Sequence, residues 1–337
     1  MLRLFSSLMI ISMTVLVSSC FKEDTLVTPH VAGKYITDTI TLTGTYKNQV
    51  YYSLSDSNAV GVNDKNLWDL GFESSASGWR VILNSSCFMK TTVLDGQIFG
   101  IPSDTTGSKW LFNPSDGSAD SLAIGHWFSI NGNDTLGTNQ LLLIDRGLDE
   151  NGIARGFCQF IMDSLKGGTY YFRIAAMKGT NPHSYSVSKK SGVNHVLFSI
   201  SNPASGISEP QNSTWDLMFS QYTTLLFTDA GQPYPYLVTG VILNPVFVEA
   251  AVDSITPFAD IDLVKAQAMT FTRQADRIGY LWKKYDFNSG SYTVNSDIAY
   301  IIRDTKGFLY KLRFIGFYKY HDNTLEKGFP SFEYQRL

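Results

Sequence analysis

Catalytic signatures are missing from this chain of 337 residues. The sequence contains no GxxxxGKS/T phosphate loop, no HExxH zinc motif, no GxSxG nucleophile motif and no dinucleotide-binding fingerprint. Its seven glutamates are scattered, so they do not indicate the paired carboxylates of a glycosidase. These absences argue against an enzyme and favour a protein that binds a ligand without transforming it.

Charge is also scarce in this sequence. Only 17% of the residues are charged, the formal net charge is −3 and no basic stripe is visible, so we do not expect nucleic acid as a partner. Hydrophobic residues make up 44% of the chain, which is enough for a sizeable folded core and argues against overall disorder.

The N-terminus has the features of a targeting segment. A short positive region at Arg3 is followed by an apolar run over residues 8–17, which is too short to span a membrane. The run ends in Leu16-Val17-Ser18-Ser19-Cys20, which resembles the lipobox of bacterial lipoproteins. We therefore predict a signal peptide over residues 1–19, cleavage before Cys20 and a lipid anchor on that cysteine.

The residues directly after the predicted lipid anchor are charged. Lys22, Glu23 and Asp24 resemble the surface-export signal of Bacteroidota lipoproteins. The prediction is therefore an outer-membrane protein that is lipid-anchored and exposed on the cell surface, with residues 20–38 as its tether.

Cysteine is rare, with three residues in the chain. If Cys20 carries lipid, Cys87 and Cys158 remain, and no CxxC motif indicates redox chemistry or zinc binding. An exported protein allows the two to pair, but their distance cannot be read from sequence. Because Cys158 lies in an apolar run, a buried and unpaired thiol is an equally good interpretation.

Aromatic residues are abundant, at 14% of the chain, with 18 Tyr and 22 Phe. Together with many Thr, Ser and Gly residues, this composition is typical of β-rich proteins. Short alternating segments separated by Gly-rich turns predict hairpins, which pair residues 141–144 with 157–162, 157–162 with 170–176, and 300–303 with 308–314.

These patterns predict an all-β fold that is mostly antiparallel, with one or two short helices. The helical periodicity lies at residues 260–269 and 273–282. Residues 131–137 and the loop 231–235, which contains two prolines, are expected to lie outside the strands.

One five-residue pattern occurs twice. Trp68-Asp69-Leu70-Gly71-Phe72 is repeated as Trp215-Asp216-Leu217-Met218-Phe219, and the two tryptophans are 215 − 68 = 147 positions apart. Each copy follows a similar lead-in strand, Tyr52-Ser53-Leu54 and Phe198-Ser199-Ile200. This repeated strand unit fits either a duplicated lobe or one β-structure whose two halves reuse a hairpin, and we expect both tryptophans to be buried. The predicted lobes are residues 39–192, which include a hairpin insertion, and 193–337.

The C-terminal segment contains two aromatic strand-like stretches, residues 312–318 (LRFIGFY) and 328–334 (GFPSFEY). They resemble the closing strands of the HmuY family, which are β-rich, haem-scavenging lipoproteins of Bacteroidota, and the Trp-Asp-Leu strands also look like that family's Trp-Asp strand. It is closest over residues 193–337, so this chain is identified as a long, divergent member with a sandwich-type β architecture. The resemblance implies haem or tetrapyrrole capture at the cell surface and delivery to a TonB-dependent receptor.

A haem site needs an apolar cleft, axial ligands to the iron and donors for the two propionates. His183 and His195 bracket a Ser- and Lys-rich loop and are the candidate axial ligands, although an isolated histidine is more often a packed or solvent-exposed side chain than a metal ligand. Lys189 and Lys190 lie nearby as possible partners of the propionates. Met162, Met177 or Met218 could replace a histidine as ligand, although Met more often fills a core, and Tyr234 is a further candidate ligand-binding residue.

The alternative interpretation is a non-enzymatic surface module for another ligand, such as a glycan or a receptor partner. It predicts that large aromatic side chains form an exposed stacking platform. The side chains considered for this platform are Trp79, Trp110, Trp127 and Tyr234.

Overall fold

The structure is a computed structural model that describes residues 31–131, 134–321 and 324–337. The predicted signal peptide, the lipid anchor at Cys20 and the export signal at Lys22, Glu23 and Asp24 lie outside these residues and stay predictions. Within the described ranges, no helix has both the length and the apolar character needed to cross a bilayer.

Strands dominate the described chain, which confirms the predicted all-β class. The only described α-helix is α2 (Leu263–Gln267), and short 3-10 helices occur at η2 (Lys65–Leu67), η3 (Ser85–Cys87), η4 (Ala119–Ser121) and η5 (Phe258–Asp260). The strands are β1 (Tyr35–Thr39), β2 (Asn48–Ser53), β3 (Asn58–Asp64), β4 (Leu70–Glu73), β5 (Val81–Leu83), β6 (Lys90–Val93), β7 (Phe128–Asn131), β8 (Asp134–Gly137), β9 (Leu142–Asp145), β10 (Phe157–Lys166), β11 (Thr169–Ala176), β12 (His183–Ser188), β13 (His195–Phe198), β14 (Leu217–Phe227), β15 (Pro233–Leu243), β16 (Glu249–Asp253), β17 (Lys283–Asp286), β18 (Ser291–Val294), β19 (Ala299–Arg303), β20 (Leu309–His321) and β21 (Thr324–Arg336).

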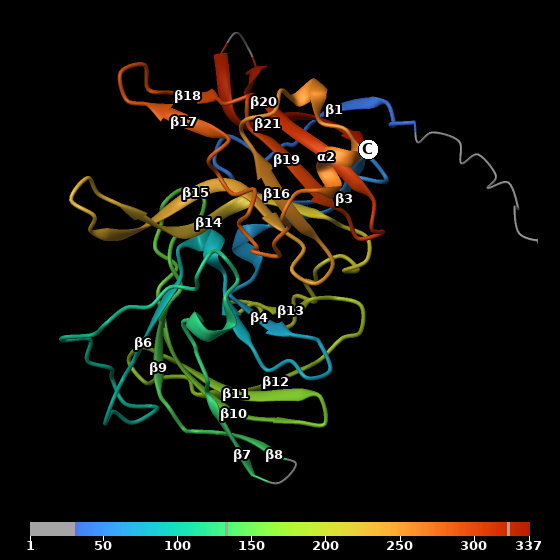
Figure 1. Cartoon of the computed structure of the whole chain (residues 1–337). Coiled ribbons are helices and arrows are strands. Elements are labelled where there is room, and N and C mark those ends of the chain that lie inside the picture. Colours follow the sequence, from blue (N-terminus) through green and yellow to red (C-terminus); the bar gives the residue numbers. More distant parts are fainter. Residues whose placement is uncertain (1–30, 132–133, 322–323) are drawn as a thin grey trace, which may run out of the picture. The chain divides into compact units, whose positions relative to one another are not determined.

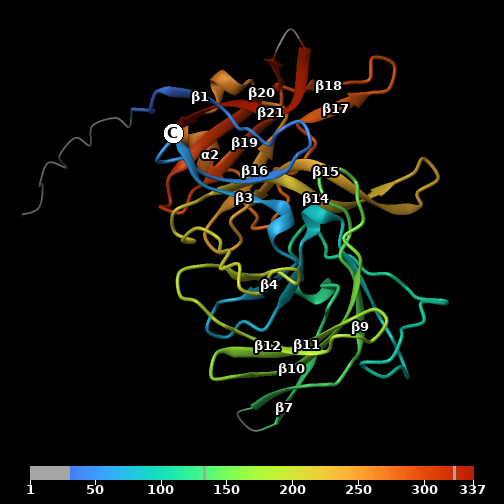
Figure 2. The same cartoon turned by 180° about the vertical axis from the view of Figure 1, so that it is seen from behind.

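All pairings between these strands are antiparallel. Four sheets have the strand orders β1-β21-β20-β19-β16, β15-β14-β2-β3, β13-β4-β5 and β17-β18. The largest sheet has the order β12-β11-β10-β8-β7, and it also contains β9, which pairs with β10, and β6, which pairs with β9. We call the β1-β21-β20-β19-β16 sheet the C-terminal sheet. In Figure 1, β14 and β15 lie between this sheet and the strands β4 and β13, and Figure 2 shows β14, β15 and β4 in the same order from behind.

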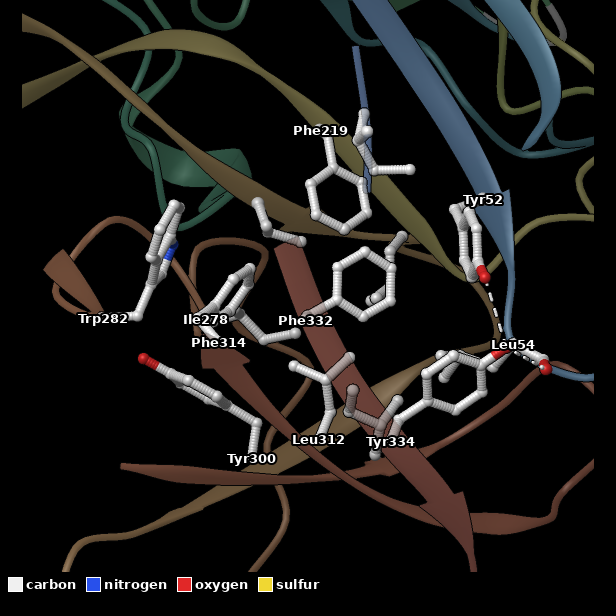
Figure 3. Packing of buried hydrophobic residues seen from close by; sticks show 14 of the residues in the cluster. Tyr52, Leu54, Phe219, Ile278, Trp282, Tyr300, Leu312, Phe314, Phe332 and Tyr334 are labelled. Carbon is white, nitrogen blue, oxygen red and sulfur yellow. Dashed lines mark hydrogen bonds between the residues drawn. The ribbon is translucent and has the colours of Figure 1, made fainter. Parts of the chain in front are cut away.

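Aromatic side chains fill the first hydrophobic core, which lies between the β15-β14-β2-β3 sheet and the C-terminal sheet (Figure 3). Trp282 and Phe314 stack with ring centroids 4.0 Å apart, and Tyr52 meets Phe332 edge to face at 5.3 Å. A second core gathers side chains from β4 to β13 and contains Cys87 and Cys158. Both thiols are buried and free, so the two cysteines do not pair.

The lead-in strands do not form hairpins with the Trp-Asp-Leu strands that follow them, so that expectation is wrong. Instead each lead-in strand pairs with the strand of the other five-residue pattern: β2 pairs with β14, and β13 pairs with β4. We call the two patterns, residues 68–72 and 215–219, the pentads, and this pairing the exchange of strand partners. Strand pairing therefore crosses residue 192 in both directions, and contacts group residues 32–337 into one unit. The two predicted lobes stay a prediction, and so does the idea that the pentads mark a repeated strand unit.

The aspartates of the two pentads hold the exchanged strands together with matching hydrogen bonds. Asp69 Oδ2 accepts from the backbone N–H of Ile200 at 2.8 Å, and Asp216 Oδ2 accepts from that of Leu54 at 2.7 Å. Each carboxylate is fully buried and binds the end of the lead-in strand from the other half of the sequence. Asp69 also forms ion pairs with Arg146 and Arg155, whereas Asp216 accepts a second backbone hydrogen bond, from Thr305.

Three local expectations are wrong. Pro233 and Pro235 belong to β15, because β15 is an edge strand where a missing N–H is tolerated. Residues 273–282 form turns instead of a helix, whereas the helix expected at 260–269 is present as α2. Residues 134–137 are a strand because they pair with β7 and β10.

Candidate functional site

A cavity of about 550 Å³ lies between the β15-β14-β2-β3 sheet and the β13-β4-β5 sheet. Each sheet turns one face toward its own hydrophobic core and lines the cavity with the other. The size falls within the range of about 300–1,000 Å³ that is typical of small-molecule sites. The cavity is therefore the candidate binding site.

The first wall of the cavity is a row of cross-strand neighbours. Met218 on β14 lies opposite Tyr51 on β2 and Ile242 on β15, and all three side chains line the cavity. Neighbours paired across antiparallel strands point to the same face of the sheet, and alternate residues point to the other. Leu217 and Phe219 therefore face the first core while Met218 faces the cavity.

The second wall contains the other pentad. Gly71 on β4 occupies the position that matches Met218, and it is paired with Ile82 on β5. A Cβ atom at Gly71 would lie 2.8 Å from Ile82 Cγ1 and 3.4 Å from His195 Cβ. Because Ile82 and His195 both line the cavity, the missing side chain at Gly71 lets these two residues lie close against the sheet.

His195 is the first residue of β13, and a carboxylate from the loop that follows β13 fixes its imidazole. Its Nδ1 lies 3.1 Å from Glu209 Oε1, and Glu209 Oε2 accepts from the backbone N–H groups of Asn194 and His195 at 3.2 and 3.0 Å. A carboxylate on one ring nitrogen is the arrangement that orients metal-binding histidines, since it leaves the other nitrogen for the metal. His195 therefore has the geometry of a pre-oriented ligand at the cavity.

A partly buried ion pair lies beside it on the same wall, with the side chains of Arg80 and Glu73 39% and 10% exposed. Arg80 donates to Glu73 from Nε at 2.8 Å and from Nη2 at 2.7 Å. Burial opposes ionisation of Glu73, but the hydrogen bonds from Arg80 and Ser75 outweigh it and hold the pKa of the carboxyl at about 2. The pair therefore stays charged at neutral pH, with the carboxylate engaged by its own protein partners.

Of the residues proposed from sequence, the structure brings His195 and Met218 to this cavity. His183 is exposed at the start of β12, and the rest of β12 and the following loop lie between it and His195 in the sequence. It is not among the cavity residues. Lys189 donates to the backbone carbonyls of Ser75, Ala76 and Gly78, so it closes a turn in the described structure. Lys190 and Tyr234 are not among the cavity residues.

Sequence reasoning missed Tyr51, Arg80, Glu209 and Tyr222, which also line the cavity. Position within a strand was the available signal for Tyr51, because it alternates with the core residue Tyr52. Glu209 lies in a loop without a motif and had no such signal. Among the described residues, no group of three or more His, Cys, Asp or Glu side chains could hold a metal ion.

The aromatic platform of the alternative interpretation is formed only in part. Trp127 is 2% exposed, and its Nε1 donates to the backbone carbonyl of Trp79. Tyr234 is 38% exposed near the tip of the β14–β15 hairpin, and its ring lies 6.3 Å from that of Tyr236. Trp110 is half-buried, with Lys90 Nζ 5.0 Å from its ring.

Comparison with known proteins places the chain in a family. No curated protein matches it. The solved structures that match include two of low similarity. A candidate HmuY-like heme binding protein from Bacteroides vulgatus ATCC 8482 has 14% identity and a TM-score of 0.19, and the match covers 52% of this chain and 90% of that protein. A candidate lipoprotein from Bacteroides fragilis NCTC 9343 has 15% identity and a TM-score of 0.17, and covers 52% of this chain and 88% of its own. The family model of the HmuY protein matches residues 45–334, most of the chain, and this protein therefore belongs to the HmuY family.

Proposed function

We propose that this protein is a cell-surface lipoprotein that captures haem or a related tetrapyrrole in the cavity and passes it to a TonB-dependent receptor. Membership of the HmuY family supports the ligand class. The proposed anchor at Cys20 and the export signal at Lys22, Glu23 and Asp24 would hold the protein where such a ligand is met. The role is binding and delivery, without chemical change to the ligand.

One observation carries this proposal: two side chains suited to iron enter the cavity from opposite walls. His195 comes from β13 with Nδ1 engaged by Glu209, and the Met218 thioether comes from β14. Haem, when bound, supplies an iron that accepts axial His and Met ligands. The apolar side chains of Ile82 and Ile242 line the same space and suit a flat apolar ring.

The residues present therefore fit the group. His195 would hold the iron from one wall and Met218 from the other, while Glu209 keeps the imidazole oriented. Arg273 also lines the cavity, 3.9 Å from Glu249, and carries positive charge that suits the ligand's carboxylates, whereas the charge of Arg80 is already paired with Glu73. Lys189, whose ammonium is engaged by backbone carbonyls, is less suited to that role than we expected.

An optical titration of the mature protein with haemin tests the proposal. We expect a sharp Soret band with low-spin features in the wild type. His195→Ala and Met218→Ala should each lose the low-spin features, and Glu209→Gln should weaken binding about tenfold or more because it disturbs the orienting contact.

His183→Ala is the matched control, since this histidine is exposed and lies outside the cavity lining. It should bind haemin as the wild type does. If the wild-type response is broad and weak, or if His195→Ala and Met218→Ala leave it unchanged, haem capture in this cavity is wrong.

Exposed aromatic side chains support a second candidate function, binding of a glycan or a receptor partner. Phe227 and Tyr236 on the β14–β15 hairpin are 66% and 51% exposed, and Tyr320 near the end of β20 is 75% exposed. Replacing these three side chains with serine would abolish binding to a glycan or to receptor-bearing cells if this candidate is right, and would leave haemin affinity unchanged.

A further inference from the structure

The two pentad tryptophans line the same cavity but differ in one hydrogen bond. Trp68 Nε1 donates to Gln49 Oε1 at 2.8 Å, and Gln49 in turn donates to Ser86 Oγ at 2.8 Å. Trp215 is 3% exposed, yet its Nε1 has no hydrogen-bond partner among the described residues. An indole N–H can only donate, and burial without an acceptor is unfavourable.

The residue at the matched position of the other half explains why the partner is missing. Tyr52 and Phe198 are matched positions, because their carbonyl oxygens accept from the backbone N–H groups of Asp216 and Asp69 respectively. Gln49 lies three residues before Tyr52, and the residue three before Phe198 is His195. The imidazole of His195 is bonded to Glu209 instead, so nothing in the described protein takes the role that Gln49 has for Trp68.

A second unpaired donor in the cavity favours a ligand that accepts hydrogen bonds. Tyr222 Oη is buried and unpaired in the described structure, and it can donate. Asn194 Oδ1 is also unpaired in the described structure, but it can only accept, because Asn194 Nδ2 donates to Asn244 Oδ1 at 3.3 Å. The buried carboxylates of Glu73 and Glu209 are already engaged, by Arg80 and His195.

We propose that the Trp215 N–H is a ligand-recognising donor that binds a carboxylate of the captured molecule. This rests on the proposed function and deepens it: the cavity selects tetrapyrroles that carry free acids over their neutral esters. The propionate arms of haem are flexible chains that end in carboxylates, so one arm can reach an indole in the wall while the ring lies between the sheets. The Tyr222 hydroxyl, further along β14, is a second donor on the same wall.

The test compares haemin with its dimethyl ester, which keeps the iron and the ring but has no carboxylate. Dissociation constants are measured by fluorescence quenching for the wild type, Trp215→Phe and Trp68→Phe. Trp215→Phe should weaken haemin binding about tenfold or more, the usual effect of losing a hydrogen bond to a charged group, and should leave the affinity for the ester nearly unchanged. In Trp68→Phe the ratio of the two affinities should equal that of the wild type.

A stability measurement supplies an independent readout. Trp68→Phe leaves Gln49 without its donor, whereas Trp215→Phe removes a donor that already lacks a partner in the described protein. The melting temperature of the ligand-free protein should therefore fall more in Trp68→Phe than in Trp215→Phe. The reverse order would contradict the assignment of an unpaired indole N–H.

The outcomes separate this inference from the proposed function. If Trp215→Phe binds haemin as the wild type does, or loses haemin and the ester equally, the carboxylate subsite is wrong while haem capture stands. If the wild type binds neither compound, haem capture is wrong and the subsite falls with it.

Discussion

The two pentad aspartates allow a strict test of what fastens the exchanged strands. Asp69 is fully buried and accepts from Arg146 Nε at 2.9 Å and from Ile200 N at 2.8 Å, and Arg155 Nη2 lies 2.9 Å from its Oδ1. The side chains of Arg146 and Arg155 are only 12% and 9% exposed. Asp69→Ala would leave two guanidinium groups nearly buried without their carboxylate, which typically costs about 3–5 kcal/mol of unfolding free energy. It would also leave the N–H group of Ile200 unpaired, at about a further 1–3 kcal/mol.

Asp216 makes matching backbone contacts but has no cation partner in the described structure. Asp216→Ala leaves the N–H groups of Leu54 and Thr305 unpaired, at about 1–3 kcal/mol each. Part of that cost is offset, because burial raises the pKa of the Asp216 carboxyl and its ionised form is already disfavoured. Asp216→Ala should therefore destabilise the protein less than Asp69→Ala.

The assay is urea denaturation at pH 7, read as the shift of the midpoint at constant slope. Asp163→Ala is the matched control, because Asp163 pairs with Arg173 at the surface, with the two side chains 31% and 34% exposed. That pair should contribute less than about 1 kcal/mol. If Asp69→Ala costs no more than the control, or less than Asp216→Ala, the idea that these carboxylates fasten the exchange is wrong.

Three further predictions follow from burial and packing. Burial lowers the pKa of Lys283 from 10.5 to about 7. Between these two pH values the unfolded chain binds a proton that the folded chain lacks, so the free energy of unfolding should rise with pH, and Lys283→Met should flatten this rise in urea titrations. Gly71→Ala should push Ile82 into the cavity and weaken haemin binding, and adding Ile82→Ala should restore it, as measured by titration. Burial raises the pKa of Cys87 to about 11 and of Cys158 to about 12, so mass-spectrometric mapping should find both alkylated only after unfolding.

Local pattern was sufficient for much of the fold. The hairpins β9–β10, β10–β11 and β19–β20 join segments that are neighbours in sequence, and each was predicted from alternation and turn residues. The buried environment of Trp68 and Trp215 also followed from residue type. The prolines of β15 were misjudged, because an edge position is a property of the sheet that local sequence does not encode.

The exchange of strand partners could not be read in the same way. Alternation shows that residues 48–53 form a strand but contains nothing that selects β14 over β4 as its partner. The cavity follows from that exchange, so only those of its residues with distinctive chemistry, His195 and Met218, could be proposed. Glu209 lies in the irregular loop that follows β13, and no spacing rule indicates its contact with His195.

The measurement that tests the central claim most directly is a crystal structure of the mature protein with haemin. We expect haemin in the cavity between the β15-β14-β2-β3 and β13-β4-β5 sheets, held by His195 and Met218. Haemin bound elsewhere, such as against the exposed aromatic side chains of the β14–β15 hairpin, with the cavity unchanged, would contradict it.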